Sequence, residues 1–219
     1  MQHQEAREEI CRVGTSLYAR GYVHASAGNI SVKLDDGSFL ITPTDACLGN
    51  LVAGELAHVN AEGVQVSGAR ASKTLVLHRS IYEAAPQARC VIHTHATHLV
   101  SLTLHGVWRN SDIVPPITPY YVMKVGHIPL VAYQRPGAPS VADEVARLIH
   151  DSTAQAKPIR GVMLDRLGPV VWQQSPAEAS AVLEELEETA KLWLMSDRQT
   201  TALSDTQIQQ LRETFGALW

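Results

Sequence analysis

Apolar positions near the start of the chain recur at helical spacing and then begin to alternate with polar ones. The helical stretch ends at Gly21, a residue typical of helix C-termini, and its apolar positions are Ile10, Val13, Leu17 and Tyr18. Alternating residues 30–34 and 38–42 then flank Asp35-Asp36-Gly37. An Asp-Gly turn between two alternating segments favours a β-hairpin. The pattern therefore predicts a helix followed by a hairpin.

The next part of the chain alternates between short strand-like and helix-like segments. Residues 56–60 and 65–67 predict a second hairpin, and residues 74–85 predict a helix that Pro86 stops. A short buried strand is expected at 89–92 and a short helix at 96–104.

The second half continues in the same way. Strands are predicted at 120–125, 128–133, 159–164 and 169–172, and an amphipathic helix is predicted at 141–150. We expect one α/β domain, a three-layer α/β/α arrangement with helices on both faces of a mostly antiparallel sheet. Residues 1–198 would form this domain, and 199–219 would be its C-terminal tail, with a weak helix over 205–218 that docks or frays.

The clearest helix signal begins at Ser175. Pro176 follows at the first helical position and Glu178 at the third, which together are typical of a capping box. The helix carries an acidic run, which we interpret as its solvated face: Glu184, Glu185, Glu187 and Glu188.

Composition and charge exclude several classes of protein. The 219 residues are 45% hydrophobic and 18% charged, which excludes a disordered or fibrous chain. A net charge of −4 argues against a nucleic-acid-binding protein, because such proteins carry an excess of positive charge. Apolar runs are too short to span a membrane, and the start of the chain shows no secretory signal. Three widely spaced cysteines indicate reduced thiols, so we expect a cytoplasmic protein.

Ten histidines against two phenylalanines direct attention to metal binding. His93 and His95 directly follow the apolar strand, and residues two apart in a strand project to the same face. Both imidazoles can therefore reach one cation, and His98 is close enough to be a third ligand or to support one. The alternative is a hydrogen-bonded pair of histidines without a metal.

Three polar segments could together bind a phosphate. Gly28 allows the backbone to approach an anion closely and Asn29 can donate through its amide, although a simple helix-to-strand turn favours the same residues. Thr44 supplies a hydroxyl near the end of the next strand. Ser72 and Lys73 precede a helix, where backbone N–H groups and the helix dipole favour phosphate.

Taken in order, these motifs resemble the class II aldolase/adducin family, whose best-known enzyme is fuculose-1-phosphate aldolase. The resemblance covers residues 5–198 and is greater to one branch, the 3-oxo-tetronate 4-phosphate decarboxylases. The matching segments include Ala27-Gly28-Asn29-Ile30-Ser31, Cys47-Leu48-Gly49, Tyr120-Tyr121-Val122-Met123, Arg135-Pro136-Gly137 and the stretch from Glu184 to Lys191.

This resemblance implies a homotetramer with active sites between subunits and a small phosphorylated sugar or sugar acid as substrate. It implies a Zn²⁺ or other divalent ion at His93 and His95. The phosphate would be held by Gly28, Asn29, Thr44, Ser72 and Lys73. Tyr120 matches a tyrosine that, in the aldolases, reaches into the site of a neighbouring subunit.

Two residues depart from the family pattern at positions of catalytic importance. Thr74 stands where the family has an acid/base glutamate, and Leu167 stands where it has a third zinc-binding histidine. A metal would therefore be held weakly, or its ligands would be completed by Asp165 or His98. Asp45 also replaces a glycine beside the phosphate, where a carboxylate is repulsive unless Lys73 or a metal offsets it.

Three hypotheses follow from this pattern. The first is a metal-dependent carbon–carbon lyase that decarboxylates a 3-oxo-tetronate 4-phosphate to a triose phosphate and CO₂, with an aldolase acting on a ketose 1-phosphate as its alternative. The second is an enzyme with a rebuilt ligand set. The third is a catalytically degenerate member that binds a ligand or serves in an assembly. We favour an enzyme, because the histidine pair and the phosphate set are both present.

Overall fold

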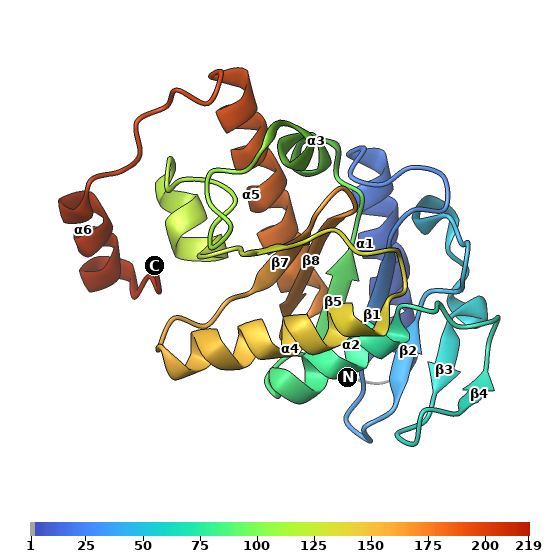
Figure 1. Ribbon diagram of the computed structural model, residues 1–219. Helices are drawn as coiled ribbons and strands as arrows, with labels where there is room; N and C mark the ends of the chain where they lie inside the picture. Colours follow the sequence, from blue (N-terminus) through green and yellow to red (C-terminus); the bar gives the residue numbers. More distant parts are fainter. Residues whose placement is uncertain (1–2) are drawn as a thin grey trace.

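The computed structural model describes residues 3–219, and an eight-stranded sheet forms the centre of this part of the chain (Figure 1). Residues 1–2, with which the predicted domain begins, lie outside it. The strands follow the order β4-β3-β2-β1-β5-β8-β7-β6. All neighbours pair antiparallel except β6 and β7, which are parallel, so the prediction of a mostly antiparallel sheet is confirmed. The strands are β1 (Asn29–Lys33), β2 (Phe39–Ile41), β3 (Ala57–Val59), β4 (Gln65–Ser67), β5 (Cys90–His93), β6 (Leu130–Val131), β7 (Gly161–Leu164) and β8 (Gly168–Gln173).

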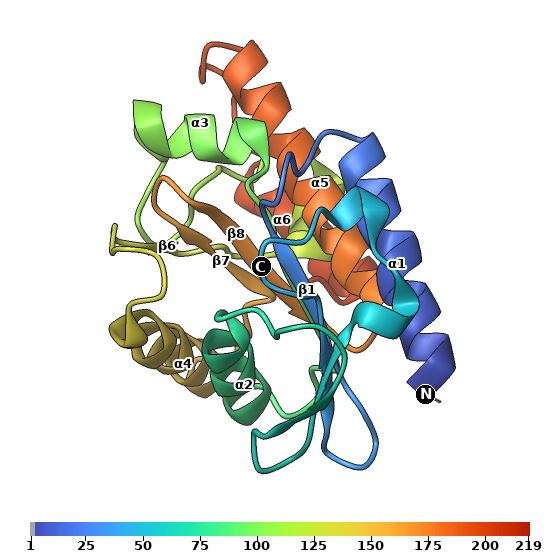
Figure 2. The same ribbon diagram turned by 90° about the vertical axis from the view of Figure 1, so that its right-hand side faces the viewer.

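Helices cover both faces of the sheet, as the hydrophobic pattern predicts. Helices α2 and α4 lie side by side on one face, and α1, α3 and α5 lie on the other (Figures 1 and 2). Their bounds are α1 (His3–Ala19), α2 (Leu75–Ala84), α3 (Thr97–His105), α4 (Pro139–Ala154), α5 (Pro176–Met195) and α6 (Asp205–Phe215). Two short 3₁₀ turns, η1 (Leu48–Asn50) and η2 (Ala53–Glu55), connect β2 to β3. The predicted three-layer α/β/α domain is therefore confirmed.

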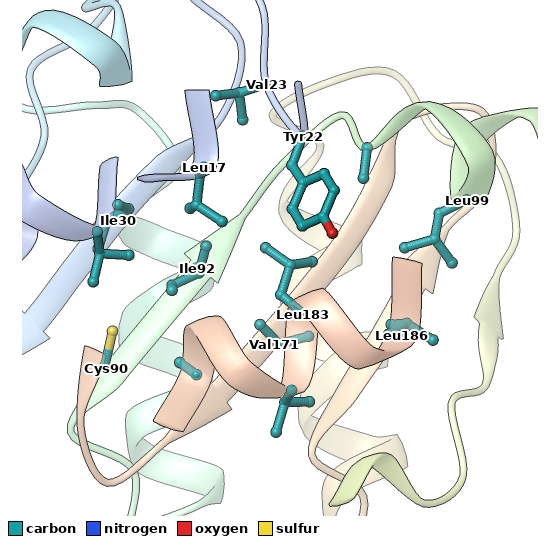
Figure 3. Packing of buried hydrophobic residues seen from close by; sticks show 14 of the residues in the cluster. Leu17, Tyr22, Val23, Ile30, Cys90, Ile92, Leu99, Val171, Leu183 and Leu186 are labelled. Carbon is teal, nitrogen blue, oxygen red and sulfur yellow. The ribbon is translucent and has the colours of Figure 1, made fainter. Parts of the chain in front are cut away.

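Each face of the sheet has its own hydrophobic core. On β5, Cys90 and Ile92 belong to the larger core under α1 and α5, and Figure 3 shows Ile92 packed near Leu17 and Leu183. Val91, between them, belongs to the smaller core under α2 and α4. Full burial of a side chain such as Ile92 stabilises the fold by roughly 1.5–3 kcal/mol. Because both faces are covered, β5 is buried along its whole length.

The segment predicted as a strand at 120–125 is instead a π-helix, η3 (Tyr121–Val125). Tyr121, Val122 and Val125 are buried, which is a helical rather than an alternating spacing. The Arg160 guanidinium donates to the carbonyls of Met123 and Lys124, at 3.2 and 3.0 Å. These tertiary contacts override the strand propensity of the aromatic and β-branched residues. Of the strand predicted at 128–133, only Leu130–Val131 is a strand, which is β6.

The prediction that the acidic run on α5 is a solvated face is wrong for Glu187. This side chain is 1% exposed, and its two carboxylate oxygens accept from the backbone N–H groups of His98 and Leu99, at 2.9 and 3.0 Å. Ala96, which precedes α3, offers no capping side chain. The carboxylate thus satisfies the N-terminal donors of α3 from a distant helix.

The C-terminal helix α6 is docked on the domain rather than frayed. Ser204 and Gln207 form a reciprocal capping box at its start. Ile208 and Ala217 are buried in a small cluster with Val122 of η3. No helix within residues 3–219 combines the length and the apolar character needed to cross a membrane.

Candidate functional site

A cavity of about 520 Å³ opens beside the end of β5, next to the beginnings of α2 and α4. Most of the residues predicted to carry chemistry line it, although they come from five separate segments. They are Gly28, Asn29, Thr44, Asp45, Ser72, Lys73, Thr74, His93, His95, Asp165 and Leu167.

Two glycines allow the loops around this cavity to come close together. Gly28 has a φ of 84°, and a Cβ there would lie 2.8 Å from the carbonyl oxygen of His93. A Cβ on Gly168 would overlap the carbonyl oxygen of Thr94. Both positions therefore require glycine, since a side chain would push the neighbouring loop away from the histidines.

His93 is held with one ring nitrogen turned toward the protein. Its Nδ1 is 2.9 Å from the carbonyl oxygen of Pro169. A carbonyl can only accept, so Nδ1 carries the proton and Nε2 keeps a lone pair. Burial, with a smaller effect from His95, lowers the pKa of His93 to about 4. The ring is therefore neutral at pH 7, which is the protonation state and tautomer of a metal-binding imidazole supported by a backbone carbonyl.

His95 lies next to His93 and faces the same cavity. The two ring centroids are 5.1 Å apart, with the planes inclined at 64°. Two imidazoles that share one tetrahedral zinc, with Zn–N distances of about 2.0–2.1 Å, have centroids roughly 5 Å apart. Burial, and to a lesser extent His24, lowers the pKa of His95, so this ring also favours its neutral form.

Sequence reasoning did not identify His78, which is completely buried at the cavity wall. Its Nδ1 is 2.7 Å from Ser31 Oγ, which is also 2.7 Å from the hydroxyl of Tyr82. Its Nε2 has no hydrogen-bond partner within residues 3–219. Burial lowers the pKa of His78 to about 3, so the ring is neutral. The sequence did contain a signal for it: in a helix, His78 lies four residues after Thr74 and therefore on the same face.

Polar and cationic groups gather on the side of the cavity where α2 begins. Asn29 is buried and its Oδ1, a hydrogen-bond acceptor, lacks a partner in the described chain, so this oxygen is available to a donor group of a ligand. Ser72 and Lys73 immediately precede α2, whose N-terminal N–H groups and dipole favour an anion. Arg135 is a second cation at the cavity wall, on the turn before α4.

The two departures from the family pattern also line the cavity. Thr74 Oγ1 is 2.9 Å from Ser72 Oγ and offers a hydroxyl where a glutamate would offer a carboxylate. Leu167 packs against the core under α2 and α4. Its apolar side chain cannot bind a metal.

Two other predicted residues do not line this cavity. His98 is turned toward α5, with its Nδ1 2.7 Å from Glu187 Oε1. Tyr120 is 60% exposed and lies in a separate surface depression with Lys124 and Glu185. Within one chain it does not meet the two histidines.

The residues present fit a metal ion only in part. His93 and His95 have the protonation state and separation that a shared cation requires. Within residues 3–219, however, no group of three His, Cys, Asp or Glu side chains is arranged to hold one. The arrangement supplies two imidazole ligands and lacks a third protein ligand at Leu167.

A cavity that combines an anion-binding helix start with paired imidazoles is typical of enzymes that act on small phosphorylated compounds. Residues 8–194 match the Class II Aldolase and Adducin N-terminal domain family. The chain belongs to this family.

Individual relatives agree with this assignment. The chain is 57% identical over 218 residues to the 3-oxo-tetronate 4-phosphate decarboxylase of Cupriavidus necator, covering 97% of both chains. It is 31% identical over 188 residues to the L-fuculose phosphate aldolase of Methanocaldococcus jannaschii, covering 86% of this chain and 93% of the other. The crystal structure of Escherichia coli YgbL superposes with a TM-score of 0.87 at 40% identity, covering 96% of this chain and 99% of that one.

Proposed function

We propose that the protein is a carbon–carbon lyase that decarboxylates a 3-oxo-tetronate 4-phosphate to a triose phosphate and CO₂. The observation that carries this proposal is the single cavity that faces both Lys73, at the start of α2, and the pair His93 and His95. Identity of 57% across almost the whole chain to a decarboxylase of this substrate class supports it. The aldolase relatives are less similar, which makes cleavage of a ketose 1-phosphate the weaker alternative.

The substrate phosphate would bind where α2 begins. Asn29 and the hydroxyls of Thr44 and Ser72 offer donors, and Lys73 offers a charge. Gly28 lets the backbone approach the anion. Asp45 lines the same region, where its carboxylate would repel the phosphate unless Lys73 or a metal offsets it.

The second anionic group of such a substrate, its carboxylate, needs a partner as well. Arg135 lines the cavity on the turn before α4, and its guanidinium makes no hydrogen bond to the rest of residues 3–219. A guanidinium matches the planar shape of a carboxylate and can bind it through two parallel hydrogen bonds. We assign Arg135 to orient this end of the substrate.

His93 and His95 would hold a divalent cation, which we propose to be zinc because imidazole ligands favour it over magnesium. Such a cation stabilises negative charge on the substrate oxygen next to the bond that breaks. Loss of CO₂ breaks a carbon–carbon bond and leaves its electron pair on the adjacent carbonyl as an enediolate. No proton must first leave a substrate hydroxyl, so this reaction tolerates Thr74 in place of a carboxylate better than aldol cleavage does.

The enediolate carbon must then gain a proton. We propose that Tyr120 of a neighbouring subunit, or water, supplies it, which requires a homotetramer with sites between subunits. The exposure of Tyr120 on a single chain supports this arrangement. Cys11, Cys47 and Cys90 are free thiols, which supports a cytoplasmic location.

Release of CO₂ from a synthetic 3-oxo-tetronate 4-phosphate by the purified protein tests the proposal directly. We expect turnover that depends on the substrate phosphate and is lost with His93→Gln. The matched control is His150→Gln on the exposed side of α4, which should leave turnover unchanged. If the wild type releases no CO₂ from this substrate with zinc, manganese or magnesium present, the proposal is wrong.

A further inference from the structure

Two carboxylates of the acidic run on α5 contact a segment that leads into the cavity. The hydroxyl of Tyr22 donates to Glu188 Oε1 at 3.1 Å, and Arg20 Nε lies 3.3 Å from Glu184 Oε1. Both partners belong to the connection between α1 and β1, which reaches the cavity wall at residues 26–29. The acidic run therefore bonds to a segment that carries cavity residues and does more than face solvent.

Glu187, in the same run, is directed at the segment that joins β5 to α3. The side chain is 1% exposed, and its Oε1 accepts from the backbone N–H and from Nδ1 of His98, at 2.9 and 2.7 Å. Its Oε2 accepts from the N–H of Leu99 at 3.0 Å. Hydrogen bonds to a carboxylate are stronger than those between neutral groups. Three of them therefore tie the start of α3 to α5.

His95 lies between this tie and the end of β5. On the β5 side, His93 belongs to the sheet, and the N–H of Thr94 donates to the carbonyl oxygen of Pro169 at 3.3 Å. On the other side, the first contact with α5 is the N–H of His98. The ring of His95 makes no hydrogen bond to the rest of residues 3–219. Its position therefore depends on the backbone between these two points.

The acceptor for the start of α3 is remote where a local one is usual. Ala96 occupies the N-cap position and has no side-chain acceptor, although Ser, Thr, Asp and Asn are preferred there. The carboxylate comes instead from a residue 89 positions further along the chain than His98. A local cap would satisfy the same N–H groups without fixing where the helix starts. A side chain of α5 does both.

We propose that Glu187 is a positioning residue for the reaction, which holds His95 at the cavity through the start of α3. This inference rests on the proposed function, in which His95 acts with His93. Glu187 lies outside the cavity lining and acts only through the backbone. A displacement of about 1 Å at a reacting group can lower turnover about 10²-fold. Binding of the substrate phosphate should change little, because that side of the cavity is built by β1, β2 and the start of α2.

Glu187→Gln tests the proposal, since it keeps the size of the side chain and replaces one acceptor oxygen with a donor. We expect kcat for CO₂ release from 3-oxo-tetronate 4-phosphate to fall roughly 10- to 100-fold, with KM changed less than about threefold. Heteronuclear NMR of the imidazole nitrogens should show an altered His95 signal and an unaltered signal for His150 on α4. Val13→Ala, in the core under α1, is the control for lost stability and should leave kcat unchanged.

A second variant separates positioning from helix capping. Ala96→Ser, added to Glu187→Gln, supplies a local cap for α3 without the tie to α5. We expect the double variant to regain thermal stability but not kcat. Recovery of both would show that Glu187 is only a cap, and the proposal would be wrong.

The remaining outcomes distinguish this inference from the proposed function. Wild-type kcat in Glu187→Gln, or a loss no larger than that in Val13→Ala, overturns the positioning role while CO₂ release by the wild type still supports the proposed function. If the wild type releases no CO₂, the proposed function fails and the NMR comparison decides alone. An unchanged His95 signal in Glu187→Gln then overturns the positioning role, and an altered one supports it.

Discussion

The two sides of the cavity differ in how they relate to the family pattern. On the side where α2 begins, Gly28, Asn29, Thr44, Ser72 and Lys73 all match it and all line the cavity. On the side of the imidazoles, His93 and His95 match, while Leu167 stands where the resemblance implies a metal ligand. Thr74 stands where the resemblance implies a carboxylate, and its Oγ1 lies 2.9 Å from Ser72 Oγ at the start of α2. The groups that would bind a phosphate are thus all present, although Asp45 beside them departs from the pattern, and the groups that would carry acid/base and metal chemistry are changed.

The difference follows from how each task is divided among residues. Anion binding is shared among several backbone and side-chain donors, a lysine and a helix dipole, so each contributes a part. Acid/base catalysis and metal binding depend on single atoms at defined positions, so one replacement alters the chemistry. His78 also lines this cavity, and its Nε2 has no hydrogen-bond partner in residues 3–219.

Restoring the two changed residues should have the largest effect. We expect Thr74→Glu combined with Leu167→His to raise the decarboxylation or aldol-cleavage rate by a factor on the order of 10²–10⁴, the usual contribution of a general acid/base. The double variant should also bind zinc more tightly. Steady-state kinetics and zinc titration measure both effects.

The matched control combines Thr74→Gln with Leu167→His, which restores the ligand but no carboxylate. It should gain zinc affinity without the gain in rate. A wild type that is already as fast as the double variant would show that other groups have taken over the chemistry.

Removal of the Lys73 charge should weaken substrate binding. A hydrogen bond to a charged group contributes about 1.5–3 kcal/mol, so Lys73→Ala should raise KM for a phosphorylated substrate roughly 10- to 100-fold, with a smaller change in kcat. Lys191→Ala, on the surface of α5, is the control and should leave KM unchanged. Equal KM values for phosphorylated and unphosphorylated substrates in the wild type would contradict the assignment of this side to phosphate.

Glu187 supports the segment that follows the two histidines, and its loss should destabilise the fold. Glu187→Ala removes the acceptor for the N–H groups of His98 and Leu99, and we expect the free energy of unfolding to fall by about 2–3 kcal/mol. Glu188→Ala, in the same acidic run but half exposed, should cost no more than about 1 kcal/mol. Urea denaturation compares the two, and equal losses would show that the buried carboxylate has no special role.

The buried imidazoles should make stability fall with acid in a defined window. The pKa of His78 is lowered to about 3, whereas an unfolded histidine has a pKa near 6.5. Below pH 6.5 His78 is protonated in the unfolded chain but stays neutral in the folded protein. The free energy of unfolding therefore decreases by up to roughly 1.4 kcal/mol for each pH unit of acidification. This contribution is complete above pH 6.5 and is lost progressively toward pH 3.

Urea denaturation between pH 7.5 and 4.5, in chelator, should show a shallower decline for His78→Asn than for the wild type. His150→Gln, which changes an exposed ring, should follow the wild type. Parallel curves for His78→Asn and the wild type would contradict the assignment of a neutral buried ring.

Local patterns were sufficient where the sequence carries a direct physical signal. The two hairpins are predicted because alternating residues flank short polar turns that contain glycine, and the structure confirms both. The helix from Ser175 is predicted by its cap, and Ser175 Oγ accepts from the N–H of Glu178 at 3.2 Å. Alternation in an extended segment predicts that His93 and His95 share one side; β5 ends at His93, and both residues line the same cavity.

Features that depend on distant parts of the chain could not be predicted in this way. The π-helix η3 is held by Arg160, about 37 residues further along, and its residues alone favour a strand. The sequence predicts a solvated Glu187, because its backbone partner at His98 is brought to it only when α3 packs against α5. The position of His78 at the cavity wall becomes evident only when helix α2 packs against β1, where His78 Nδ1 lies 2.7 Å from Ser31 Oγ.

The sequence by itself determined the layers and the family, and it predicted residues for the phosphate side that line one cavity, because hydrophobic periodicity and loop motifs act over a few residues. Only the tertiary structure decided which imidazoles face one another, that His98 is bound to Glu187, and that Tyr120 lies away from its own chain's cavity. The physical reason is that a hydrogen bond or a shared ligand depends on distances of a few ångströms between residues far apart in sequence. Those distances exist only once both faces of the sheet are packed.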